Sequence, residues 1–226
     1  MFGKNKVAAK NKAAAQAPVD DGNKKYLGFG ALLILMNHNP EESMAMKAPR
    51  GDIATMLKSS WDIVDRESAL STIDWALNEG HRARFGEAFV RFKEGDASAI
   101  PSQNAKEFSR FLEVVRNWKL NQEDAANCRT LLAWDLERAA FLARTCQHVG
   151  YITEPEAWDI LIHRVCPVAK QSFSTWGQYG MSFVEGRTFC YGGNCCDGTL
   201  ALLRLTVDKN KKGKQSIWFR YPLESL

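Results

Sequence analysis

Apolar side chains recur at steps of three and four residues along most of this chain, and this spacing constrains its fold more than any other feature. Residues 85–92, 108–115 and 158–165 each place apolar side chains at positions i, i+3, i+4 and i+7. This spacing lines one face of an α-helix. Several such helices in one chain predict a bundle in which the apolar faces share a core.

Local start and stop signals bound several of these helices. Asp65 is predicted to cap a helix that stops at Gly80, where a left-handed backbone is expected. Thr153 and Glu156 form a capping-box sequence before the helix that carries residues 158–165. Further helices are predicted over residues 26–36, 41–58 with a break at 49–51, 123–148 and 174–189, the last with glycines that indicate tight helix packing.

The pattern changes after Asn194. Residues 200–207 and 216–221 are rich in leucine, β-branched and aromatic residues, and the lysine-rich segment 208–214 lies between them. This arrangement favours a β-hairpin over about residues 199–222. The predicted fold class is therefore mainly α, a compact multi-helix bundle with a short C-terminal β-hairpin.

Charge is concentrated at the two ends of the chain. Thirty Lys and Arg against 26 Asp and Glu give a net charge of +4, and the first twelve residues hold four lysines and no acid. We predict a disordered basic tail over residues 1–25 and a single helical domain over 26–226. Because the domain itself is nearly neutral, no nucleic-acid partner is expected for the folded body.

The length of the apolar segments helps to predict where in the cell the protein is found. The longest, residues 26–36, has about half the length of a membrane span, and the basic tail lacks the apolar run of a secretory signal. Six cysteines without an export signal favour a reducing compartment. A cytoplasmic protein without a membrane span is the expectation.

The predicted helix 123–148 carries the most informative polar residue. Leu136, Ala139 and Ala143 lie within about 40° of Leu132 around the helix axis, and Asp135 lies beside this apolar stripe. A buried carboxylate must be paired, hydrogen-bonded or protonated. The candidate ligand-binding residues are Asp135, Arg138 one turn on, and four residues that packing could bring close: Asp74, His81, Arg82 and Arg187.

Two interpretations of these residues stay open. In the structural one, Asp135 and Arg138 form an ion pair that fixes helix register, while His81 and Arg82 cap the preceding helix. In the functional one, they form a polar pocket for a small anionic ligand or for acid–base chemistry, with His81 titrating near neutral pH.

Signals for catalysis and metal binding are weak. The chain lacks the Gly-x-Ser-x-Gly, phosphate-loop, dinucleotide-binding and His-Glu-x-x-His motifs. Cys146 and His148 lie two residues apart on a predicted helix and point about 200° away from each other, and the cysteines between 190 and 196 lack an evident fourth ligand. No metal site, no cofactor and no catalytic residue is assigned.

Several motifs carry a family resemblance. SSWDI near residue 60, DWALNEGHR at 74–82, AWDLERAAFLARTCQHVGYITEPEAW at 133–158 and FSTWGQYGMSFVEGR at 173–187 resemble the bacterial family known as domain of unknown function 1266. The resemblance covers about residues 57–190 and implies a bacterial, mostly helical protein. It carries no established activity, but it includes the candidate residues selected above.

The preferred functional hypothesis is a helical binding domain with a polar cleft that receives a protein partner segment or a small anionic ligand. The first alternative is an enzyme, a hydrolase or transferase on a phosphorylated substrate, with His81 or Asp74 as base and arginines holding the anion. The second is an immunity-type or structural partner protein that acts through an exposed aromatic patch.

Overall fold

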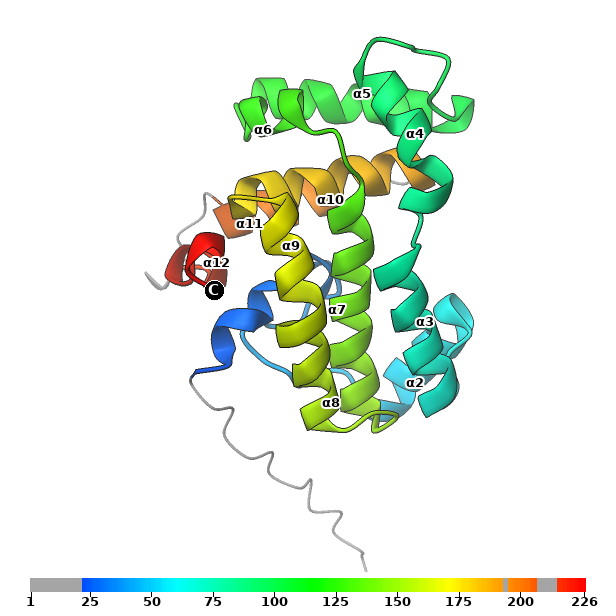
Figure 1. Ribbon diagram of the computed structural model, residues 1–226, viewed down its shortest axis with the longest axis vertical. Coiled ribbons are helices and arrows are strands. Elements are labelled where there is room, and N and C mark those ends of the chain that lie inside the picture. The colour runs from blue at the N-terminus through cyan, green and yellow to red at the C-terminus, as the bar shows by residue number, and fades with distance from the viewer. Residues whose placement is uncertain (1–21, 193–194, 207–214) are drawn as a thin grey trace, which may run out of the picture.

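The computed structural model describes residues 22–192, 195–206 and 215–226, which form a bundle of helices with no β-strand in these ranges. The central helix is α7, and α1, α2, α3 and α10 all pack against it (Figure 1). The predicted mainly helical fold is confirmed. The elements are η1 (Lys24–Gly28), α1 (Ala31–Met36), α2 (Arg50–Trp61), α3 (Arg66–Asn78), α4 (Arg82–Lys93), α5 (Ser102–Asn117), α6 (Gln122–Asn127), α7 (Leu132–Val149), α8 (Glu154–Asp159), η2 (Ile160–Val165), α9 (Cys166–Ser172), α10 (Trp176–Tyr191), α11 (Cys195–Thr206), α12 (Ile217–Arg220) and η3 (Leu223–Ser225).

Helix α7 is surrounded by other elements along nearly its whole length. Every residue from Ala133 to Cys146 is buried, including four charged ones. A helix that is buried on all sides is normally apolar all round, so each of these charges needs a specific partner. The positions of those partners determine how the other elements are held against α7.

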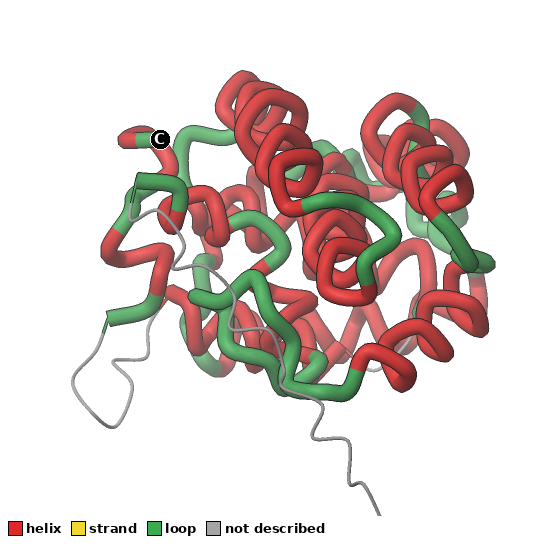
Figure 2. Tube along the Cα trace, turned by 90° about the horizontal axis from the view of Figure 1, so that it is seen from below, coloured by secondary structure: helices red, strands yellow, loops and turns green. Residues whose placement is uncertain are grey.

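Helix α10 crosses α7 and carries α5 and α6 on its other side (Figure 1). It also packs against α11, which contacts α12. Figure 2 shows helices joined by loops and turns, with no strand in the described ranges. The glycines of α10 allow close approach. A Cβ on Gly186 would lie 2.7 Å from the Cβ of Trp134 on α7, and Gly180 faces Leu202 of α11 and Trp218 of α12. The predicted tight packing of this helix is confirmed.

The predicted helix signals are also present. Asp65 caps α3 by accepting a 2.9 Å hydrogen bond from the amide of Ser68, and Gly80 has a φ of +60°. Thr153 and Glu156 form the reciprocal capping box at the start of α8. Local sequence therefore determined these ends.

Removing this capping box is expected to cost a modest part of the stability. Thr153→Ala leaves the amide of Glu156 without its side-chain acceptor, and we expect the free energy of unfolding to fall by about 1 kcal/mol. Urea denaturation measures the change. Thr55→Ala is the control, because Thr55 is an exposed threonine inside α2. If both variants lose the same amount, the capping box contributes nothing of its own.

The predicted C-terminal β-hairpin is wrong. Residues 195–206 form helix α11, which buries Ala201, Leu202 and Leu205, and residues 217–220 form α12. Leucine favours a helix at least as well as a strand. The contacts of this segment with α10 and α1 therefore determine that it is helical. The turn predicted at 208–214 lies outside the described residues.

Three other segments differ from their predicted extents. Residues 26–36 divide at Gly30 into η1 and α1, and the helix predicted over 41–58 begins only at Arg50 after Pro49. The predicted helix 123–148 is interrupted at 128–131 by an extended Cys128, which separates α6 from α7. Most of the predicted basic tail, residues 1–21, lies outside the described residues. None of the described helices is both long and apolar enough to cross a membrane.

Candidate functional site

Asp135, on the first turn of α7, is the centre of a polar cluster. Its fully buried carboxylate accepts hydrogen bonds from the backbone amides of His81 at 2.8 Å and Arg82 at 3.1 Å, and from Arg82 Nη1 at 3.1 Å. These donors lie where α3 ends and α4 begins. Asp135 therefore fixes the α3–α4 turn against the central helix.

Arg82 completes this connection. Its guanidinium donates to the carbonyls of Ala76 at 2.9 Å and Leu77 at 2.6 Å, in the last turn of α3. For Arg82 these contacts agree with the structural interpretation, in which it caps the preceding helix. A structural role thus accounts for all the described contacts of Arg82 and for the strongest ones of Asp135.

Arg138 has a different environment. Its guanidinium lies over the rings of Trp61, Trp75 and Trp134, at 4.7, 5.3 and 5.2 Å from their centroids. These tryptophans come from α2, α3 and α7, and each contributes an attractive cation–π interaction. Burial lowers the pKa of Arg138, and the charge of Asp135 opposes this shift.

His81 lies between Arg138 and the surface. Its Nδ1 contacts the guanidinium of Arg138, and because a guanidinium can only donate, Nδ1 is the acceptor in this contact. The ring also contacts Trp75 and Tyr191, which are 36% and 64% exposed. We call Arg138, His81, Trp75, Trp134 and Tyr191 the arginine–aromatic cluster.

The structure brings His81, Arg82, Asp135 and Arg138 together. Asp74 is half-exposed and accepts a 2.6 Å hydrogen bond from Arg164 instead. Arg187 is half-buried in α10, one residue after Gly186.

Sequence reasoning missed a second buried charge cluster on α7. Glu137 accepts from the amides of Gly30, Leu32 and Leu33 at the start of α1. Arg144 is fully buried and donates to the carbonyls of four residues in the N-terminal segment: Leu27, Phe29, Glu41 and Ser43. Burial raises the pKa of Glu137 to about 7 and lowers that of Arg144 to about 10.

A sequence signal for this pair existed. Glu137 and Arg144 are seven residues apart, which places them on one face of an α-helix two turns from each other. Both also lie within the apolar stretch that predicted a buried helix. The pair anchors the N-terminal segment to α7, much as Asp135 anchors the α3–α4 turn.

A third buried pair joins α4 to α10. Lys93 donates to both carboxylate oxygens of Glu185, at 3.0 and 2.8 Å, and to the carbonyl of Ala125. Burial raises the pKa of Glu185 to about 7 and that of the nearby Cys128 thiol to about 12. Cys128 is therefore a neutral thiol near pH 7.

Metal ligands do not gather in the described part of the chain. No group of three or more His, Cys, Asp or Glu residues there is placed to hold an ion. Cys128, Cys146, Cys166 and Cys190 are free thiols, and the side chains of Cys195 and Cys196 lie outside the described residues. His148 instead bonds the backbone at Met46 and Ala48.

These features define a mainly helical protein whose buried central helix holds charged clusters, one of which reaches the surface through aromatic rings. The chain belongs to the family described as Protein of unknown function (DUF1266), which matches residues 56–223. The predicted family is confirmed. The match also extends beyond the predicted limit of 190, so α11 and most of the C-terminal segment fall within it.

One curated relative supports a bacterial family. The chain is 26% identical over 139 residues to the "Uncharacterized protein YbeR" of Escherichia coli (strain K12), a match that covers 59% of this chain and 56% of the relative. The chain thus spans little more than half the length of that relative. No solved structure matches the chain significantly.

Proposed function

We propose that this protein is a binding domain and that its arginine–aromatic cluster binds an anionic group, a carboxylate or a phosphate, carried by a small molecule or a partner segment. The observation that carries the proposal is the buried guanidinium of Arg138. Its side chain is 8% exposed, yet its nearest carboxylate oxygen, on Asp135, is 3.8 Å away. This ion pair is long, and Asp135 also pairs with Arg82 at 3.1 Å. A buried cation that shares its counter-charge with a second arginine favours a further anion.

The charges around Asp135 support this proposal. One carboxylate faces two guanidinium groups, and it forms its short contacts with Arg82 and with backbone amides. Among these three side chains the fixed charges therefore sum to one positive charge, located on Arg138. The three tryptophan faces stabilise this charge but do not neutralise it.

The donor groups nearby match an anion as well. Among the described residues, the indole Nε1 of Trp134 is buried and has no hydrogen-bond partner. Arg138 and Trp134 therefore both carry donor groups, and charge-assisted hydrogen bonds to carboxylate or phosphate are stronger than neutral ones. The exposed rims of Trp75 and Tyr191 offer apolar contact to whatever carries the anion.

In this proposal Asp135 and Arg82 position the α3–α4 turn and His81, and they do not contact the ligand. The proposal gives no role to Asp74 or Arg187 in binding the anion. The alternative of an enzyme with a paired Asp74 and His81 has less support, because Asp74 binds Arg164.

Titrating the protein with phosphate, acetate and citrate while recording tryptophan fluorescence tests the proposal directly, because three tryptophans surround Arg138. We expect a saturable change for the wild-type protein. Arg138→Gln is expected to weaken binding by about tenfold or more, the value of one charge-assisted hydrogen bond. Circular dichroism reports whether the variant remains folded.

Two further variants separate specific binding from general charge effects. Arg84→Gln removes an exposed positive charge from the neighbouring helix α4 and should bind as the wild type does. Tyr191→Ala removes an exposed rim residue and should weaken binding without unfolding the protein. The proposal fails if no anion binds, or if Arg84→Gln loses as much affinity as Arg138→Gln.

A further inference from the structure

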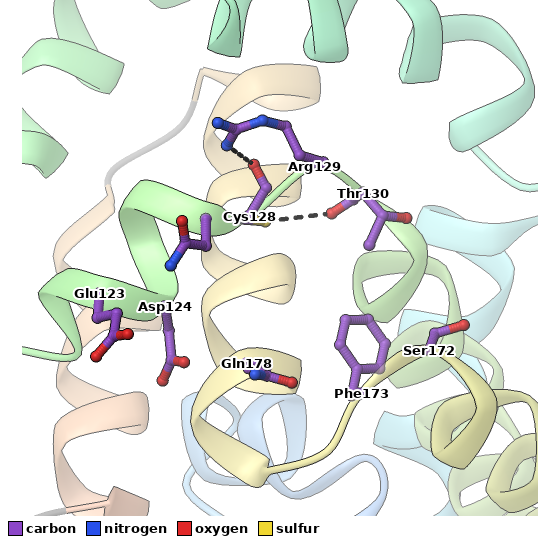
Figure 3. Close-up of a pocket in the computed structure, with 9 residues that line it drawn as sticks. Glu123, Asp124, Cys128, Arg129, Thr130, Ser172, Phe173 and Gln178 are labelled. Carbon is purple, nitrogen blue, oxygen red and sulfur yellow. Dashed lines mark hydrogen bonds between the residues drawn. The ribbon is translucent and has the colours of Figure 1, made fainter.

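A cavity lies on another part of the molecule, away from the arginine–aromatic cluster. Its volume is about 340 Å³, and it opens between α6, the link from α6 to α7, the end of α9 and the start of α10. Figure 3 shows its side chains, which come from Glu123, Asp124, Asn127, Cys128, Arg129, Thr130, Ser172, Phe173 and Gln178. This volume is in the range of cavities that bind small molecules.

Two acidic residues set the charge of one wall. Glu123 and Asp124 are neighbours on α6, and Figure 3 shows their side chains on the same side of the cavity. The Asp124 carboxylate is held by Asn121 Nδ2 at 2.9 Å. The carboxylate lies beside Gly177, in the first turn of α10.

Among the described residues, neither of the two nearby cations, Arg129 and Lys93, forms an ion pair with Glu123 or Asp124. Arg129 turns its Nη1 to the carbonyls of Ala126 at 2.7 Å and Cys128 at 2.8 Å, and Figure 3 shows the guanidinium against the link. Lys93 binds both carboxylate oxygens of Glu185. The Cys128 thiol in the wall adds no charge.

The opposite wall is less polar. The Phe173 ring faces Thr130 and Cys128 across the cavity (Figure 3). Phe173 is buried, with 6% of its surface exposed. Gln178 is already engaged through its Oε1, which accepts from the amide of Ser174 at 2.8 Å. The cavity thus combines two carboxylates on one wall with an aromatic ring on the other, and its one arginine, Arg129, directs its guanidinium to backbone carbonyls of the link.

We infer that this cavity binds a small organic amine, with the ammonium group at Glu123 and Asp124 and an apolar portion against Phe173. An ammonium ion donates up to three hydrogen bonds, which suits two adjacent carboxylates and the nearby amide oxygens. The inference rests on the cavity and its walls and does not depend on the arginine–aromatic cluster.

Three matched probes test the chemistry: 2-phenylethylamine, 2-phenylethanol and phenylacetate, which share the ring and differ in charge. Isothermal titration calorimetry with the full-length protein should give the tightest binding for the amine and the weakest for the carboxylate. Glu123→Gln should weaken binding of the amine by about tenfold and leave binding of the alcohol unchanged. Glu123 is exposed, so this variant should fold normally.

Glu113→Gln is the matched control, because it removes an exposed carboxylate on α5 that does not line the cavity; it should bind the amine as the wild type does. Arg138→Gln should also keep amine binding, which separates this site from the one proposed above. The inference is overturned if the amine does not bind, if amine and alcohol bind equally, or if Glu123→Gln has no effect.

Discussion

Gly80→Ala is expected to lower the free energy of unfolding by about 3 kcal/mol or more. Gly80 has a φ of +60°, a left-handed conformation that an L-residue adopts only at a cost of about 1–2 kcal/mol. A Cβ at this position would also overlap the carboxylate of Asp135. Asp135 cannot move away without losing its hydrogen bonds to the amides of His81 and Arg82, so the two costs add.

Urea denaturation followed by circular dichroism measures this loss, and Gly86→Ala is the matched control. Gly86 lies within α4 and has no neighbouring atom within 4 Å of an added Cβ. Alanine there should raise the stability by about 0.5–1 kcal/mol, because it is a better helix former. Equal stability of the Gly80 variant and the wild type would show that Asp135 does not restrain the turn.

Glu137→Ala is expected to have an effect at least as large, a loss of about 3–5 kcal/mol. The substitution removes the acceptor of three amides at the start of α1: those of Gly30, Leu32 and Leu33. It also removes the carboxylate that offsets the buried charge of Arg144. An unpaired buried charge is costly, so α1 and the segment before it should detach from α7 first.

Denaturation gives the total loss, and hydrogen exchange of the α1 amides shows where it arises. Glu113→Ala, which removes an exposed glutamate from α5, should change the stability by less than about 0.5 kcal/mol. The double variant Glu137→Ala/Arg144→Met should lose less than the sum of the two single variants, because their interaction is lost only once. Additive losses would contradict the coupling of these charges across α7.

Asp135 and Arg138 differ in how much of their environment could be predicted from the sequence. Helical periodicity alone predicted that Asp135 points into the core, and the carboxylate is fully buried. The same periodicity placed Arg138 near it, at the edge of the helix. It did not predict that three tryptophans from three helices would surround the guanidinium, because that depends on how the helices cross.

The sequence by itself determined the helical class of this protein, the family, the caps at Asp65 and Thr153 and the left-handed Gly80. The caps and the left-handed glycine depend on residues within a few positions of one another, and the helical class depends on the spacing of apolar residues along each segment. Only the tertiary structure decided that residues 195–206 form a helix, that the helix predicted over 123–148 is divided, and that Asp74 pairs with Arg164. These outcomes depend on contacts between segments distant in sequence, where burial against a neighbour outweighs local preference.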